Sequence, residues 1–258
     1  MEAGQLGRRD RLALAVQRVV GRLLSPLWVP ATVVLMRFGL GWRIVDVART
    51  RGVYRDLRRS HEPLLVCANH LTLIDSAIIA WALGSWAWFL AHYASLPWNV
   101  PERRNFSTSL GSRVLVYLMR CVPVERGGDR NEVAGVLARL TYLLRRREAV
   151  LVFPEGGRSR TGRVEVENVT YGVGRVIAAL PGCRVLCVYL RGEGQDGFSD
   201  LPARGERFHV RSAALQPTSA MSGMRGARDL SQQVVHTLAD LERDYFQERS
   251  PGVADARQ

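Results

Sequence analysis

Short runs of uninterrupted apolar residues, each ending directly in a polar or glycine-rich cluster, constrain this chain more than any other feature. The run PLLVCA at 63–68 ends in an Asn-His pair at 69–70, and the run AVLVF at 149–153 ends in PEGG at 154–157. Apolar runs of this length are typical of strands that are buried on both faces, as in parallel sheets. We therefore expect a ligand site beyond the carboxyl ends of these strands.

Segments with helical periodicity separate the apolar runs. Val133, Val136, Leu137, Leu140 and Leu144, for example, recur at the spacing of one helix face. We expect further strands at 120–125, 184–190 and 207–213, and helices at 74–93, 110–119, 131–144, 171–180 and from Asp229 or Ser231 to about Phe246. Strands that alternate with helices predict an α/β domain with a largely parallel central sheet flanked by helices.

The chain divides by composition into an apolar and basic N-terminal segment at 1–50, a globular domain at 51–248 and a polar tail at 249–258 that we expect to be disordered. Leu23 to Met36 carries no charge but contains two prolines. It is shorter than the roughly 20 apolar residues that a spanning helix needs.

We predict that this segment is an amphipathic helix or a bent hairpin in the membrane interface, with Trp28 and Trp42 at headgroup level. A buried helix packed on the domain is the alternative.

The basic residues outnumber the acidic ones by 36 to 24, which gives a net charge of +12. This excess favours an anionic partner, either a phospholipid surface, a phosphorylated substrate or nucleic acid, although a merely solvated basic surface would look the same. All 36 are arginine, so a P-loop lysine and a Schiff-base lysine are excluded. The four cysteines lie mostly in apolar runs without metal-ligand spacing, and we expect no metal site.

His70 and Asp75 follow the first strand and form the first candidate for chemistry. A histidine held by a carboxylate is a general base, because the carboxylate fixes the tautomer and stabilises the imidazolium. Five residues correspond to about 140° around a helix, so the two side chains would diverge if both were helical. They can meet if His70 lies in the turn and Asp75 lies one turn inside the helix.

A second cluster, FPEGGRSR at 153–160, follows the strand at 149–153. Its glycines would allow a ligand to approach the backbone closely, and the guanidinium groups of Arg158 and Arg160 are forked donors for an anion such as phosphate. An ordinary glycine-rich turn with surface arginines would have the same composition.

Taken together, the NHxxxxD element at 69–75 and the FPEGxRSR element about 80 residues later resemble the glycerolipid acyltransferase family, which contains the 1-acylglycerol-3-phosphate acyltransferases. The resemblance extends roughly over 63–190. The segment VPVER at 122–126 is similar to a third motif of that family. The chain departs from the family at Gly157, where threonine is usual, and in the strand at 184–189, which lacks the family's proline.

The resemblance implies that residues 51–248 form an acyltransferase domain. His70, oriented by Asp75, would take the proton of an acceptor hydroxyl, which then attacks the thioester of acyl-CoA or acyl carrier protein. Arg126 and Arg158 would hold the phosphate of a lysophospholipid such as 1-acylglycerol 3-phosphate, and Glu155 with Gly156 would shape the acceptor site.

No cofactor besides the acyl donor is implied, and no GxSxG nucleophile elbow is present. The expected location is the cytoplasmic face of the inner membrane, as a monotopic or peripheral protein.

Two alternatives remain. The same chemistry on another acceptor, an amino-acid lipid or a specialised polyketide-like lipid, fits the divergent motif edges and the arginine-rich segment at 191–211. A basic nucleic-acid-binding module belongs to a different class. We find no recognised nucleic-acid motif and no interleaving of aromatic with basic residues, and we expect no nucleic-acid partner.

Overall fold

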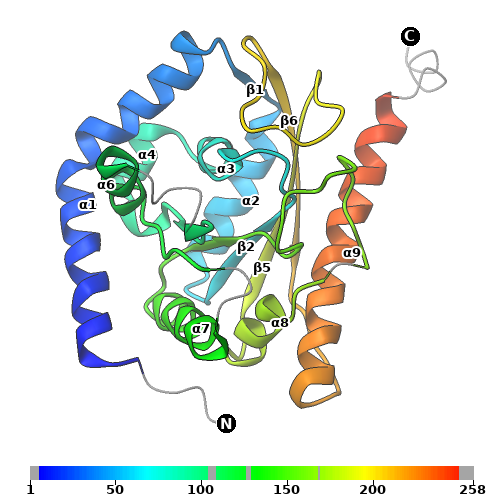
Figure 1. Cartoon of the computed structure of the whole chain (residues 1–258). Helices are drawn as coiled ribbons and strands as arrows, with labels where there is room; N and C mark the ends of the chain where they lie inside the picture. The colour runs from blue at the N-terminus through cyan, green and yellow to red at the C-terminus, as the bar shows by residue number, and fades with distance from the viewer. Residues whose placement is uncertain (1–5, 104–108, 126–128, 168, 250–258) are drawn as a thin grey trace.

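The computed structural model describes residues 6–103, 109–125, 129–167 and 169–249. It has a six-stranded sheet with helices on both faces (Figure 1). The strand order is β1-β6-β5-β2-β4-β3, and every neighbouring pair is parallel except β5 with β6. The strands are β1 (Arg43–Val45), β2 (Leu64–Ala68), β3 (Trp98–Asn99), β4 (Val150–Val152), β5 (Arg184–Gly192) and β6 (Arg207–Leu215). The expected largely parallel α/β sheet is confirmed.

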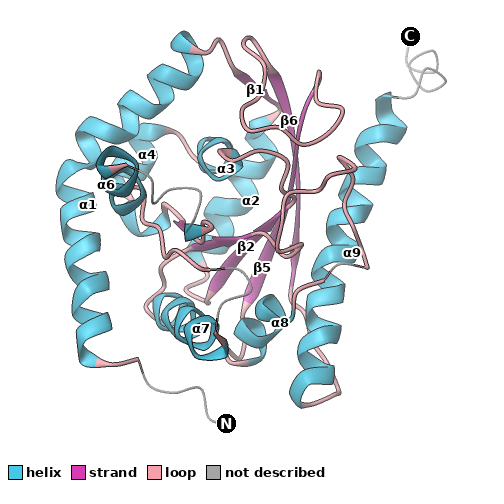
Figure 2. Ribbon diagram, viewed as in Figure 1, coloured by secondary structure: helices cyan, strands magenta, loops and turns pink. Residues whose placement is uncertain are grey.

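The helices form one layer on each side of the sheet (Figure 2). One layer contains α1 (Arg8–Val34), its continuation as the π-helical turn η1 (Leu35–Gly39), α2 (Val47–Arg59), α3 (Asp75–Leu83), α4 (Trp86–Ala91) and the 3-10 turn η2 (Tyr93–Ser95). The other contains α7 (Arg130–Arg145), α8 (Tyr171–Ala178) and α9 (Gly223–Arg249). A further helix, α6 (Leu110–Leu118), lies against α1.

The central strands are apolar throughout because both of their faces are covered. In β2, Leu64 and Val66 face the core under α1–α4, whereas Leu65 and Cys67 face the core under α7–α9. All four are fully buried. The four cysteines are buried free thiols, as expected for small core residues.

Two expected elements differ from the structure. The helix predicted over 74–93 breaks at Gly84, whose extended backbone brings it against Trp88 and Phe89, where a Cβ would lie 2.7–2.9 Å from their rings. The strand predicted over 120–125 is reduced to isolated bridges at Cys121 and Val124. Arg120, the first residue of that range, has a left-handed backbone (φ +58°) and is therefore not part of a strand.

Three elements were not predicted. β1 and β3 are too short to leave a pattern, with three and two residues. Helix α2 is rich in arginine, and its buried residues Thr50, Tyr54 and Leu57 form a stripe too narrow to be recognised as apolar periodicity. The expected boundary between residues 50 and 51 falls within this helix. The expected tail from residue 250 onwards lies outside the described residues.

The N-terminal segment is one long helix, bent along its length, rather than a hairpin (Figure 1). Pro26 and Pro30 lie inside α1, and the Arg22 carbonyl, which Pro26 cannot satisfy because it has no N–H, accepts the Ser25 hydroxyl instead (2.8 Å). Together with η1 it extends over Arg8–Gly39, 32 residues, and among the described helices it is the one long and apolar enough to cross a membrane.

Trp42 does not reach headgroup level. It is buried, and its indole N–H donates to the Ala203 carbonyl (2.7 Å).

Helix α1 has two apolar faces. Its inner face packs on the domain through Leu14, Gly21 and Val29. Its outer face carries an exposed stripe, which we call the outer stripe, of residues that are 47–73% exposed: Leu12, Val16, Val19, Leu23 and Leu27. The spacings of three and four residues place this stripe on one side of the helix, away from the sheet.

Candidate active site

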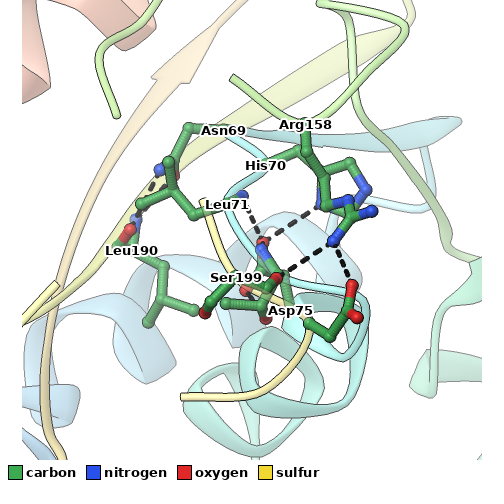
Figure 3. A network of polar contacts seen from close by, with 9 residues as sticks. Asn69, His70, Leu71, Asp75, Arg158, Leu190 and Ser199 are labelled. Carbon is green, nitrogen blue, oxygen red and sulfur yellow. Dashed lines mark hydrogen bonds and ion pairs between the residues drawn. The ribbon is translucent and has the colours of Figure 1, made fainter. Parts of the chain in front are cut away.

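His70 and Asp75 meet at the carboxyl end of β2. The imidazole Nδ1 lies 3.1 Å from the Asp75 carboxylate (Figure 3). Asp75 is the first residue of α3, not one turn inside it as the sequence led us to expect. The five-residue separation closes because residues 71–74 form a tight turn between strand and helix.

The Asp75 carboxylate is held by several donors at once. One oxygen accepts the backbone N–H groups of Leu71 (2.6 Å) and Thr72 (2.7 Å), and the other accepts the Thr72 hydroxyl. These donors fix the position of the Asp75 carboxylate independently of its contact with the imidazole of His70. Since Nδ1–H of His70 donates to it, Nε2 has the free lone pair that a general base requires.

His70 is fixed from other sides as well. Its ring stacks on Phe153, directly after β4, with centroids 4.0 Å apart and planes 14° apart. Its carbonyl accepts the backbone N–H of Ser159 (2.8 Å). Asn69 bonds both backbone groups of Leu190 in β5, at 2.8 and 2.9 Å. Asn69 and Phe153 thus position the histidine, a role that their place in the motifs alone did not indicate.

Glu155 and Gly156 form the turn after β4. The pKa of Glu155 is raised to about 7, chiefly because burial disfavours its charged form, while backbone N–H groups of Glu165 and His70 oppose the shift. Its Oε1 is shielded from solvent and has no hydrogen-bond partner among the described residues. Gly156 has φ +68°, and a Cβ there would lie 2.4 Å from the Thr170 methyl group, so glycine is required.

Arg158 lies beside His70 but already has partners (Figure 3). Its Nη1 donates to the Asp200 carboxylate (2.7 Å) and to the Ser199 carbonyl (3.1 Å). The same segment is bonded to the motif turn through Ser199 N–H to Leu71 O (3.1 Å) and Leu73 N–H to Asp200 O (3.2 Å). A loop after β5 therefore closes the site, which no sequence motif predicted.

Two further site predictions remain open. Arg126 lies outside the described residues. No cluster of three or more potential metal ligands occurs in the parts of the chain that the structure describes. An apolar groove lies between α1 and α3–α4, lined by Trp28, Val29 and Thr32 on one side and by Ser76 and Ala77 on the other. Its lining residue Ser76 directly follows Asp75 in the chain.

The arrangement can remove a proton from a hydroxyl group, because a buried imidazole with one free nitrogen is held by a carboxylate in a fixed orientation. A partly exposed guanidinium beside it can bind an anionic group of the same molecule. A protein-family model described as Acyltransferase matches residues 51–191, more than half of the chain and inclusive of both motif clusters. Comparison with curated proteins gave no match.

Proposed function

The chain belongs to the acyltransferase family, and from that premise we propose that it transfers a fatty acyl group from acyl-CoA or acyl carrier protein to a hydroxyl of a lysophospholipid such as 1-acylglycerol 3-phosphate. The observation that carries this proposal is the buried His70–Asp75 pair at the carboxyl end of the sheet. An acyl transfer to oxygen needs a base for the acceptor hydroxyl, and a histidine held by a carboxylate can act as that base.

The proposed reaction is a direct displacement. Nε2 of His70 takes the proton as the acceptor oxygen attacks the thioester carbonyl, and Asp75 stabilises the imidazolium that forms. Collapse of the tetrahedral intermediate breaks the C–S bond, and the leaving thiolate takes up the proton from His70. The products are an ester and a free thiol, with no acyl-enzyme. The four cysteines, all buried, are not needed as nucleophiles.

Arg158 is proposed to bind the acceptor phosphate, together with Arg126. The phosphate then competes with Asp200 for the Arg158 guanidinium. Asp200 is 76% exposed at its side chain, and an exposed ion pair contributes at most about 1 kcal/mol. A phosphate with nearly two charges displaces such a carboxylate readily. Asp200 therefore holds the arginine in place in the free enzyme and yields to the acceptor.

Membrane association is proposed from the outer stripe of α1. Five exposed apolar side chains on that face, and the exposed Leu110 and Val114 of the adjacent α6, leave a large apolar surface in contact with water. Insertion of this surface into one leaflet would bring the apolar groove beside α3 close to the acyl chains. The proposed location is the cytoplasmic face of the inner membrane.

The test is acyl transfer by purified protein in mixed micelles, with labelled acyl-CoA and labelled acyl carrier protein as donors. The acceptor panel contains lysophosphatidate, a neutral lysophospholipid and an amino-acid lyso-lipid, and a His70→Ala variant is the control. We expect product with lysophosphatidate from the wild type only. Transfer to the amino-acid lipid but not to lysophosphatidate would replace the proposed acceptor with the alternative one.

A further inference from the structure

Besides the apolar groove, the structure has a basic cavity, which lies beside α1 and far from His70. It has a volume of about 380 Å³, within the range of small-molecule pockets. Arg18, Val19 and Arg22 of α1 form one wall, the end of α4 and η2 with His92 forms another, and Glu148 lies at the base.

The carboxylate and the η2 carbonyls around this cavity are already used, whereas the buried Tyr93 hydroxyl has no partner among the described residues. Both oxygens of Glu148 pair with guanidinium groups, one with Arg18 (3.1 Å) and the other with the buried Arg120. The carbonyls of the η2 wall are also occupied: Tyr93 O accepts from Arg120, Ala94 O from Arg58, and Ser95 O from Tyr54.

The donor groups, in contrast, are in excess. Arg22 is exposed and its guanidinium has no partner among the described residues. Arg18 uses one nitrogen for Glu148 and remains 37% exposed. The exposed His92 donates through Nδ1 to the Trp88 carbonyl (3.1 Å), so its Nε2 is left facing the solvent and is a donor only when the ring is protonated. A cavity with spare guanidinium donors, a carboxylate that is already paired and a net positive charge favours an anion.

The position of the cavity identifies the source of that anion. Val19 belongs both to the cavity wall and to the outer stripe of α1. Arg18 and Arg22 are one turn apart on the same flank of the helix, next to that stripe. An anion held there therefore sits at the border between the apolar surface and the basic flank, where the phosphate of a bilayer lipid lies when its acyl chains contact the stripe.

We infer that this cavity is a binding site for the phosphate headgroup of an anionic phospholipid, separate from the proposed acceptor site. Arg22 and Arg18 hold the phosphate from the α1 wall, and His92 contacts the headgroup from the other wall. A lipid bound here fixes the rotation of α1 against the bilayer. The site works with or without acyl transfer, but it rests on the proposed contact of the outer stripe with the bilayer.

The test is binding of the full-length protein to vesicles of pure phosphatidylcholine and to vesicles that also contain phosphatidylglycerol, at low and high salt and without acyl donor. We expect Arg22→Gln to weaken binding to the anionic vesicles on the order of tenfold, because hydrogen bonds to a charged group are lost. Arg22→Lys keeps the charge but not the fork, and restores binding only in part.

The matched control is Arg11→Gln, which removes an exposed charge from the same flank of α1 outside the cavity. We expect Arg11→Gln to weaken binding to the anionic vesicles by at most about fivefold at low salt and not at all at high salt, because only long-range attraction is lost. The weaker binding of Arg22→Gln should persist at high salt. Equal losses in both variants that salt abolishes, or complete rescue by Arg22→Lys, would reduce the site to general surface attraction.

A second readout locates the headgroup. In NMR titrations, short-chain phosphatidylglycerol shifts the ring resonances of His92 but not those of the exposed His236 on α9. If the ligand is the lipid rather than the free ion, inorganic phosphate at the same concentration leaves the ring resonances of His92 and His236 unchanged. An unmoved His92 contradicts the site. The variant His70→Ala, inactive by design, binds the lipid normally, so failure of acyl transfer and failure of this site are distinguishable.

Discussion

We predict that His70 and Asp75 act as one unit, because the hydrogen bond between them would fix the tautomer of the imidazole. We expect His70→Ala to lower acyl transfer by about 100- to 10,000-fold while the circular dichroism spectrum is unchanged. Asp75→Asn should lower acyl transfer by the same factor or by a smaller one. The double variant should be no less active than the less active single variant. The exposed His236→Ala is the control. Near-normal turnover in His70→Ala would falsify the general-base mechanism.

Substitutions of Arg158 and of Asp200 should change the affinity for the acceptor in opposite directions. Arg158→Ala raises the acceptor KM, or lowers kcat/KM for the acceptor, far more than it affects the donor, and Arg158→Lys rescues in part. Asp200→Asn removes the competing carboxylate and lowers the KM for a phosphorylated acceptor several-fold, but not for a neutral one. Steady-state kinetics with both acceptors measure this. A higher KM in Asp200→Asn would mean that the carboxylate orients Arg158 rather than competing for it.

The raised pKa of Glu155 makes the free energy of unfolding depend on pH. Its pKa is raised by burial from an ordinary value of 4.5 to about 7 in the folded protein. Between these values the folded state holds a proton that the unfolded state has lost, so stability falls as pH rises from about 4.5 to 7 and levels off above. Urea denaturation at pH 5 and pH 8 measures this loss, and we expect Glu155→Gln to reduce it. An identical loss in the variant would assign it to other groups.

At the scale of elements, α8 and α9 touch so closely that one position accepts only glycine. A Cβ on Gly174 would lie 1.7 Å from the Ala227 carbonyl oxygen of α9, and the Gly174 N–H donates to the Ser231 hydroxyl (2.8 Å). We expect Gly174→Ala to destabilise the protein by about 1–3 kcal/mol, because one helix must move away from the other. Urea denaturation gives the free energy of unfolding.

Gly172 is the matched control in the same helix. A Cβ there meets only the Leu137 side chain at 3.6 Å, an ordinary contact. Gly172→Ala should therefore be neutral or stabilise by up to about 1 kcal/mol, through helix propensity alone. If both alanines had the same effect, the close approach of α8 to α9 would not be the cause.

At the scale of the whole molecule, α1 belongs both to the domain and to the proposed membrane surface. Deletion of residues 1–42 would remove the buried Leu14, Val29 and Met36, and so would damage the core as well as membrane binding. The double variant Leu23→Gln/Leu27→Gln changes only exposed positions of the outer stripe. We expect it to weaken binding to neutral vesicles several-fold, because apolar burial is lost.

The control for the outer stripe is Met224→Gln, an exposed apolar residue on α9 across the sheet from α1. It should bind vesicles normally. For the wild type, high salt should release only part of the membrane-bound protein and detergent should release all of it, since salt screens charge but not apolar contact. Complete release by salt, or equal defects in both variants, would contradict insertion of the stripe.

Strands β2, β4, β5 and β6, the largely parallel fold and the two motif clusters could be predicted from the sequence alone. These follow from local rules, since burial on both faces requires a continuous apolar run and a general base requires a histidine near a carboxylate. Short elements such as β3 carry no such pattern. The sequence left a helix and a bent hairpin open for the segment with Pro26 and Pro30, because a proline can end or kink a helix, and the structure has a helix there.

The closure of the site and the partners of its charged groups depend on contacts between segments that are distant in the chain. Asp200 lies 42 residues from Arg158 in the chain, and Asn69 bonds Leu190 across 121 residues. The rise of the Glu155 pKa and the excess of donors around Arg22 likewise depend on which groups surround them. Burial and charge pairing are sums over neighbours in space, and those neighbours are brought together by the order of strands in the sheet rather than by their order in the chain.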